Sequence, residues 1–243
     1  MNLTEHFKLE KERNIKKLGK DKKLRDLALE FIKHSSQYKY SYNFTWLGRP
    51  IIQIPQDIVA MQEMIWQVKP DLIIETGIAH GGSLIFYASM LELIGNGKVL
   101  GIDIDIRKHN RREIGKHKMF KRIEMIEGSS VDEKVIKKVE KIVKQHKKIL
   151  VCLDSLHTHN HVLNELNIYS KFVSKGSYLV VFDTVIEYMP KGFFKNRPWD
   201  KDNNPATAVK QFLKKNKNFV VDKEIDNKLL ITSAPRGFLK RVK

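Results

Sequence analysis

Short apolar runs alternate with amphipathic segments over most of the chain, and this pattern predicts an α/β fold. Strands are expected near residues 71–75, 98–103, 122–127, 148–153 and 177–182, and helices near 56–68, 82–94, 108–117, 131–145 and 159–173. Because strands and helices of these lengths take turns along the chain, the strands should lie parallel in one sheet with helices on both faces.

The last part of the chain extends this sheet. The pattern indicates a loop over 184–203, a helix near 205–215 and two final strands near 218–222 and 228–232. Only a short turn around Asp226-Asn227 separates the two strands, which predicts a hairpin and therefore one antiparallel strand. We expect a Rossmann-like domain over residues 56–243, with a seven-stranded, mostly parallel sheet.

Residues 1–55 precede this sheet and are expected to form a separate extension. Residues 1–36 are basic and have helical apolar spacing with a break at Gly19, whereas 38–54 is aromatic and irregular because prolines oppose regular structure there. The helices carry apolar side chains that must be covered, namely Phe7, Leu24, Leu27 and Phe31. The extension should therefore cap the mouth of the active site and contribute to a homo-oligomer. The alternative is a helix pair packed on the flank of its own domain.

The most informative segment is Asp71–Ser83, which reads Asp-Leu-Ile-Ile-Glu-Thr-Gly-Ile-Ala-His-Gly-Gly-Ser. A buried strand is followed by an acid and a glycine-rich turn that opens a helix, and a second strand ends at Asp103. Glycines let the backbone approach a ligand, and an acid after the second strand can hold ribose hydroxyls. The turn lacks the spacing of dinucleotide sites, so Glu75 before Gly77 fits a cofactor without pyrophosphate, such as S-adenosylmethionine. An ordinary strand-to-helix turn is the alternative.

Polar residues follow each of the five parallel strands, although the strand interiors are apolar. Ligands of open parallel sheets bind at these carboxyl ends. The residues concerned are Glu75, Thr76, Gly77, Gly81 and Ser83, then Asp103, then Ser129 and Ser130, then Asp154 and His157, and finally Asp183 and Glu187. A structural protein would have little reason to gather acids and histidines at one edge, so the pattern indicates an enzyme.

Asp154 and Asp183 follow adjacent strands, so their carboxylates should lie on one rim within reach of a shared cation. Two oxygen ligands with open water positions suit magnesium. His157 lies one turn after Asp154 and could take a proton from a hydroxyl near neutral pH. Two alternatives are a helix N-cap at Asp154 and a solvated His157. Another is soft-metal binding by His157, His159 and His161, although their spacing points them in different directions.

Composition narrows the class of protein. The chain has 243 residues, 42% of them hydrophobic, and is long enough for a substantial core. No apolar run approaches the roughly 20 residues of a membrane helix, and the charged N-terminus has no apolar signal region, so we expect a cytoplasmic protein. The single cysteine, Cys152, lies in an apolar strand and is predicted to be a core residue.

The formal charge of +17 is large enough to attract nucleic acid, an anionic membrane surface or a phosphorylated substrate. Most of the excess is lysine spread over many helices. The densest cluster, Arg107 to Arg122, has no interleaved aromatic pattern, which favours a solvated basic helix over nucleic-acid binding. Attraction of an anionic substrate remains open.

Several motifs together resemble the cephalosporin hydroxylase (cephamycin biosynthesis) family over residues 38–215. They are Trp46-Leu-Gly-Arg-Pro-Ile-Ile-Gln53, Pro70 to Leu84, Leu153-Asp-Ser-Leu-His-Thr-His159, His161-Val-Leu-Asn-Glu-Leu166, Val181-Phe-Asp-Thr184, Arg197-Pro-Trp199 and Asn203 to Val209. Members resemble class I S-adenosylmethionine-dependent methyltransferases with a magnesium site, and relatives include macrolide-sugar and rhamnosyl O-methyltransferases. The resemblance implies a class I methyltransferase fold.

The resemblance also implies roles for the strand-end residues. Glu75, Gly77 and Ser83 would line the methionine side of the cofactor, Asp103 would hold the ribose, and Ser129 and Ser130 would flank the adenine. Asp154 and Asp183 would bind the metal, and His157 would be the general base. Related sites often have an acidic pair after the fifth strand, whereas Phe182 precedes Asp183 here; Glu187, Thr184 or water would replace the missing ligand.

We therefore expect methyl transfer to a hydroxyl of a small molecule or sugar, such as a secondary metabolite or a glycan of the lipopolysaccharide type. Magnesium would coordinate two oxygens of the acceptor and lower the pKa of the attacking one. The alternatives are a cation-independent methyltransferase that uses His157 alone and a basic RNA-binding methyltransferase-like protein, for which no recognition module is evident. Hydroxylase chemistry is disfavoured because no iron-binding triad is present.

Overall fold

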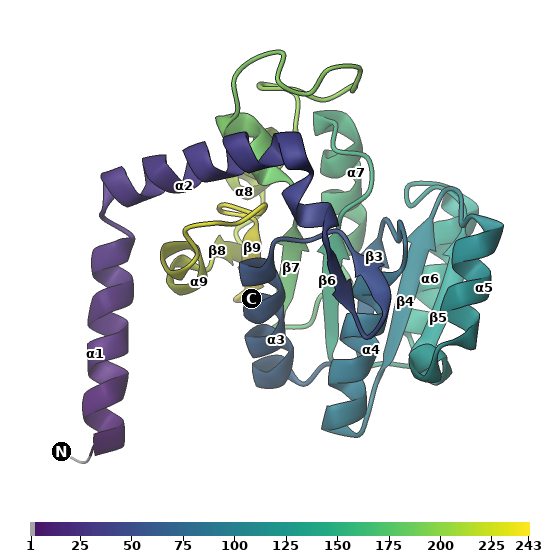
Figure 1. Ribbon diagram of the computed structural model, residues 1–243. Coiled ribbons are helices and arrows are strands. Elements are labelled where there is room, and N and C mark those ends of the chain that lie inside the picture. Colours follow the sequence, from purple (N-terminus) through teal and green to yellow (C-terminus); the bar gives the residue numbers. More distant parts are fainter. Residues whose placement is uncertain (1–2) are drawn as a thin grey trace.

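A seven-stranded sheet forms the centre of the computed structural model, which describes residues 3–243 (Figure 1). Its strands are β3 (Leu72–Thr76), β4 (Lys98–Asp103), β5 (Ile123–Glu127), β6 (Ile149–Leu153), β7 (Tyr178–Val181), β8 (Phe219–Val221) and β9 (Phe238–Arg241). Their order is β5-β4-β3-β6-β7-β9-β8. The first five strands are parallel, and β9 is antiparallel to both of its neighbours, so the expected sheet with one antiparallel strand is confirmed.

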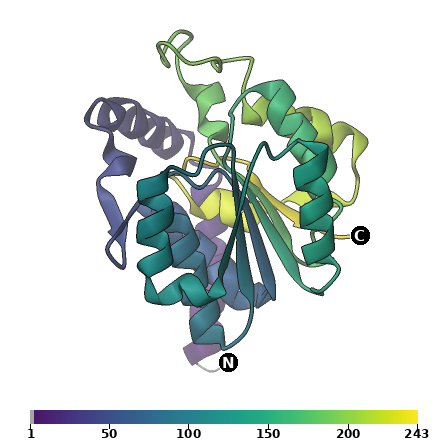
Figure 2. The ribbon, with the colours of Figure 1, turned by 90° about the vertical axis from the view of Figure 1, so that its right-hand side faces the viewer.

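Helices cover both faces of the sheet, as Figure 2 shows. One face packs on α3 (Pro55–Val68), α4 (Gly82–Ile94) and α5 (Lys108–Lys116), and the other on α6 (Glu133–Val143), α7 (His159–Tyr169) and α8 (Pro205–Lys215). Successive strand residues alternate between the two cores: Ile73 belongs to the first and Ile74 to the second. Strands buried on both faces must be apolar throughout, which explains the continuous apolar runs.

Two helices and a small hairpin precede the sheet. They comprise α1 (Leu3–Leu18), α2 (Lys22–Ser35), the 3-10 turns η1 (Ser36–Tyr38) and η2 (Tyr40–Tyr42), and the strands β1 (Phe44–Trp46) and β2 (Arg49–Ile51). The helical prediction with a break at Gly19 is confirmed. The prediction of an irregular 38–54 segment is wrong for the hairpin, because Pro50 lies opposite Thr45 in a two-stranded ribbon, where an edge strand tolerates a missing N–H.

The hairpin packs on α4 of the main domain, and α1 and α2 lie along its α9 side, where α1 contacts α9 and Arg25 of α2 donates to Asn227 Oδ1 at 3.3 Å (Figure 1). Trp46 contacts Phe86 edge to face at 4.7 Å and donates its indole N–H to Ser89 Oγ at 3.0 Å. A Cβ on Gly82 would lie 2.1 Å from the carbonyl oxygen of Pro50, so only glycine permits this close approach of the hairpin to α4.

The C-terminal hairpin predicted around Asp226-Asn227 is wrong. That segment is the helix α9 (Lys223–Lys228), and the last strand comes only at β9. Asp222 explains the difference, because its carboxylate accepts hydrogen bonds from the backbone N–H groups of Glu224 and Ile225 and so caps the first turn of α9. Among the helices of residues 3–243, none is both long and apolar enough to cross a bilayer.

Candidate active site

The turn after β3 lies at the switch point of the sheet, between β4 and β6. Gly77 has φ of +88°, and a Cβ there would lie 2.1 Å from the carbonyl oxygen of Asp154 on the neighbouring strand's loop, so this position requires glycine. Asp103, at the end of β4, accepts hydrogen bonds from the N–H groups of Ile78 at 2.7 Å and Ala79 at 3.3 Å. Asp103 therefore fixes the shape of the turn, a role additional to the expected contact with ribose.

Two residues that the sequence reasoning did not identify hold the other side of this turn. Arg49 of β2 donates from Nη2 to the carbonyl oxygen of His80 at 2.5 Å and to Asn110 Oδ1 at 3.2 Å. Asn110 of α5 in turn donates to the carbonyl oxygen of Ala79 at 3.0 Å. The sequence motif around Arg49 contributes to the family resemblance, but its contact with the turn cannot be read from sequence spacing.

Glu75 is fully buried at the end of β3. Its Oε2 accepts a hydrogen bond from Ser83 Oγ at 2.6 Å, while its Oε1 has no hydrogen-bond partner among residues 3–243. Burial raises the pKa of this carboxyl to about 8, against the lowering effect of the hydrogen bond from Ser83. The hydroxyl of the adjacent Thr76 is also buried without a partner. Such groups are suited to bind a polar or cationic group of a ligand.

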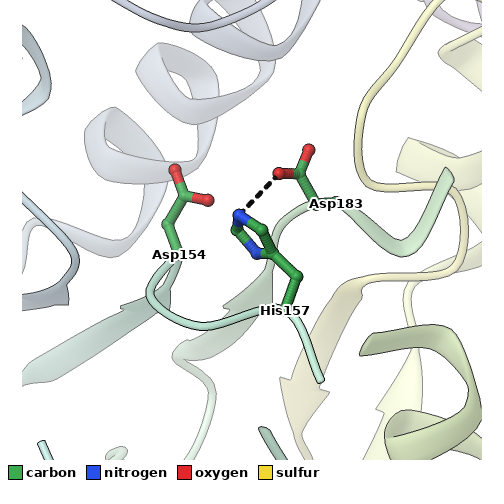
Figure 3. A group of neighbouring side chains, drawn as sticks. All are labelled: Asp154, His157 and Asp183. Carbon is green, nitrogen blue, oxygen red and sulfur yellow. Dashed lines mark ion pairs between the residues drawn. The ribbon is translucent and has the colours of Figure 1, made fainter. Parts of the chain in front are cut away.

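Asp154, His157 and Asp183 come together at the carboxyl ends of β6 and β7 (Figure 3). One ligand atom from each of them lies within 4.8 Å of the others, and all three residues are half-buried. His157 Nε2 lies 3.1 Å from Asp183 Oδ2. The structure therefore brings together the two predicted metal ligands and the predicted base.

The surroundings of this group disfavour the ionisation of both carboxyl groups at once. Loss of hydration raises the pKa of Asp154 well above its usual range, and the nearby charges of Asp183, Glu75 and Glu165 add to the effect. Asp183 adopts φ of 55°, a left-handed conformation that is uncommon outside glycine. A bound cation would relieve the repulsion between the carboxylates, and oxygen ligands of this kind suit magnesium.

Glu187 lies in η4 (Thr184–Tyr188) and is not part of this three-residue group. Its Oε2 accepts hydrogen bonds from Asn204 Nδ2 at 2.6 Å and from the N–H of Asp202 at 3.0 Å, which anchors the loop before α8. That loop carries Trp199, whose ring contacts the imidazole of His157 edge to face at 4.7 Å between centroids. The Trp199 ring therefore lies against the side chain of His157.

Ser129 and Ser130 follow β5, and Ser130 belongs to a buried hydrogen-bonded network. Ser130 Oγ lies 3.2 Å from His161 Nε2, which lies 3.0 Å from Ser155 Oγ. Ser155 donates to Oε1 of the fully buried Glu165 at 2.8 Å. The network links the expected adenine side to the residue next to Asp154. Glu165 was missed, although a glutamate between Val162 and Leu166 on the apolar face of a helix was a visible signal.

Comparison with known proteins identifies the class to which this fold and site belong. The family model described as "Rhamnosyl O-methyltransferase/CmcI" matches residues 38–242. The Rhamnosyl O-methyltransferase of Mycobacterium tuberculosis (strain H37Rv) is 31% identical over 207 residues, which cover 81% of this chain and 78% of that protein. The Mycobacterium leprae protein of the same name is 29% identical over 148 residues, covering 60% of this chain and 62% of that one.

Solved structures agree on the fold. An apo-structure of CmcI superposes with a TM-score of 0.60 at 18% identity and covers 83% of this chain and 77% of that one. CmcI in its Mg–SAM form gives a TM-score of 0.58 at 19% identity, with 83% and 78% coverage.

The chain belongs to the Rhamnosyl O-methyltransferase/CmcI family. It is therefore an O-methyltransferase, and the resemblance seen in the sequence motifs is confirmed.

Proposed function

We propose that this O-methyltransferase transfers the methyl group of S-adenosylmethionine to a hydroxyl of a sugar or small molecule, with the help of magnesium. The observation that carries the proposal is the group of Asp154, His157 and Asp183, which lies beside the Gly77 turn at the switch point. Vicinal oxygens on the acceptor would suit the two-carboxylate rim, because both could bind one cation. The related rhamnosyl enzymes and CmcI in its Mg–SAM form are consistent with this chemistry.

The cofactor would lie across the turn after β3. Glu75, Thr76, Gly77, Gly81 and Ser83 would surround its methionine portion, and the free Oε1 of Glu75 offers an acceptor for the cofactor's ammonium group. The ribose would meet Asp103, and the adenine would lie near Ser129 and Ser130. S-adenosylmethionine supplies a methyl group activated by its positively charged sulfur.

The acidic rim fits a divalent cation. Asp154 and Asp183 would hold it, and we keep Glu187 as a further candidate that would have to leave Asn204 to reach the metal. Burial raises the pKa of Asp154 and the neighbouring carboxylates raise it further, which supports a cation at this place. Bound magnesium would lower the pKa of a coordinated hydroxyl.

His157 would accept the hydroxyl proton at Nε2, because this nitrogen faces the carboxylates of the rim (Figure 3). Asp183 would orient the ring through its contact with Nε2 until the acceptor replaces that contact. Trp199 packs against the imidazole and would keep water from one side of it. The loop from Phe182 to Asn204 would form a wall of the acceptor pocket.

We also propose that residues 1–55 are the extension through which the protein forms a homo-oligomer and covers the active-site mouth. Phe7 is 68% exposed and Leu27 is 57% exposed, so α1 and α2 present apolar side chains that residues 3–243 of the same chain do not bury. Removal of residues 1–36 tests this proposal: loss of oligomeric mass and of turnover supports it, and a folded protein with both unchanged refutes it.

Calorimetry tests the cofactor directly. S-adenosylmethionine and its demethylated product should bind to the wild-type protein, and a nicotinamide cofactor should not. Binding of the nicotinamide cofactor alone would overturn the proposal. With an acceptor that turns over, a chelator should abolish methyl transfer and magnesium should restore it; turnover that survives chelation would favour a cation-independent reaction through His157.

A further inference from the structure

A cavity of about 950 Å³ lies beside α8, outside the Asp154–His157–Asp183 group. Its lining includes Thr184, Glu187 and Tyr188 of η4 on one side, and Pro235 and Arg236 of the loop before β9. Residues of α8 line the other side. Thr184 of this lining directly follows Asp183 in the chain, although Asp183 itself does not line the cavity.

Four cationic side chains line this cavity. Lys210 and Lys214 lie four residues apart on α8, Lys217 follows three residues later just beyond the end of the helix, and Arg236 comes from the loop before β9. None of the four takes part in a salt bridge within residues 3–243. The lining also contains the carboxylates of Asp202 and Glu187. Oε2 of Glu187 is already hydrogen-bonded to the loop before α8. Cations thus outnumber carboxylates, and the balance favours an anion.

We propose that this cavity binds a phosphate or diphosphate group of the acceptor, so that the enzyme methylates a phosphorylated sugar or alcohol rather than a neutral one. Arginine and lysine side chains match phosphate oxygens in charge and in hydrogen-bond donors. With the phosphate held beside α8, the hydroxyl-bearing part of the same molecule extends past Thr184 to Asp183 and His157. This inference rests on the proposed function and names the class of its acceptor.

A matched set of lysines elsewhere makes the proposal testable. Lys134, Lys138 and Lys141 on α6 have the same spacing in sequence as Lys210, Lys214 and Lys217 and are exposed like them, but they line no part of this cavity. The cavity variant is Lys210→Gln, Lys214→Gln and Lys217→Gln together, and the control is Lys134→Gln, Lys138→Gln and Lys141→Gln. Both lose three charges, so a general effect of net charge would weaken anion binding equally.

The experiment measures binding of inorganic pyrophosphate and of orthophosphate by calorimetry at constant ionic strength, without magnesium. We expect pyrophosphate to bind wild type and the α6 variant alike, and to bind the α8 variant at least about tenfold more weakly. Tighter binding of pyrophosphate than of orthophosphate would indicate a diphosphate-linked acceptor, and the reverse a monophosphate ester. No binding to wild type, or equal weakening in both variants, would overturn the proposal.

Binding of S-adenosylhomocysteine serves as the independent readout. It should be unchanged in both lysine variants, because none of the six residues lies in the turn after β3. If wild type binds S-adenosylhomocysteine but not pyrophosphate, only the anion site is wrong. If it fails to bind S-adenosylhomocysteine, the proposed function itself is wrong.

Discussion

The turn after β3 and the rim formed by β6 and β7 lie at the same edge of the sheet but are stabilised in different ways. Asp103, Arg49 and Asn110 hydrogen-bond to the backbone of the turn from three sides. The rim instead gathers titratable groups that oppose one another, and the Asp154 carboxylate accepts no hydrogen bond from the described residues. The backbone of the turn is thus held in shape by the protein alone, whereas the rim keeps a repulsion between carboxylates that a bound cation can relieve.

This difference predicts that rim substitutions affect turnover much more than stability. His157→Gln should lower kcat by about 1,000-fold, because a general base supplies a large share of the barrier reduction. Binding of S-adenosylhomocysteine and the melting temperature should change little. A kcat within a few-fold of wild type, measured with magnesium and a competent acceptor, would show that another group takes the proton.

Substitution in the turn should have the opposite effect. Gly77→Ala places a methyl group against the carbonyl oxygen of Asp154 and forces alanine to adopt φ of +88°, so we expect a loss of about 3–5 kcal/mol of folding free energy. Chemical denaturation measures it. Gly95→Ala is the matched control, because Gly95 has φ of +86° but no atom within 4 Å of the added Cβ. Equal losses in both variants would mean that the close approach to Asp154 contributes nothing.

Glu75 connects the two regions, and its pKa of about 8 gives a pH dependence with a definite sign. The unfolded carboxyl ionises near pH 4.5, whereas the folded one stays protonated up to about pH 8, so wild type loses stability as pH rises between these values. Glu75→Gln lacks this loss. By pH 9 the variant should exceed wild type by on the order of 5 kcal/mol relative to their difference at pH 4. Parallel stability curves would refute a raised pKa.

A smaller effect on stability is expected in the hydrogen-bonded network that links Ser130, on the proposed adenine side, to Ser155 beside Asp154. Ser155→Ala removes the hydrogen bond to the buried Glu165 and should cost about 1 kcal/mol of stability. Because Ser155 adjoins Asp154, the apparent affinity for magnesium should also fall, whereas Ser174→Ala, which removes bonds to Ile149 and Lys147, should leave it unchanged. Equal magnesium affinity in wild type, Ser155→Ala and Ser174→Ala would mean that the hydrogen bond from Ser155 to Glu165 has no influence on the metal site.

The sequence predicted those features of the turn and the rim that depend on local pattern. Apolar runs located the five parallel strands, and strand ends pointed to Asp103, Asp154 and Asp183, because parallel strands bring their carboxyl ends to one edge. Arg49 and Trp199 could not be placed in the same way. Each reaches the site from a segment distant in sequence, and only the three-dimensional path of that segment decides which backbone or ring it contacts.

In the C-terminal region, local pattern predicted the wrong element. The turn-like pair at Asp226-Asn227 suggested a hairpin, but Asp222 caps a helix that includes the pair. Both interpretations use common turn residues, and the N-cap interaction with two backbone N–H groups outweighs the turn preference. The β9 strand then forms after the loop that places Arg236 at the edge of the α8 cavity.

We infer that the rim of Asp154 and Asp183 is a cation site whose charges oppose one another until it is filled. Magnesium titration by calorimetry, in the presence of S-adenosylhomocysteine and in buffers of different ionisation enthalpy, tests it most directly. Because the pKa of Asp154 is raised, binding should release a proton, and the affinity should increase as pH rises. Asp154→Asn should abolish the proton release and weaken binding by at least about 30-fold. Binding that is independent of pH and equal in wild type and Asp154→Asn would contradict the account.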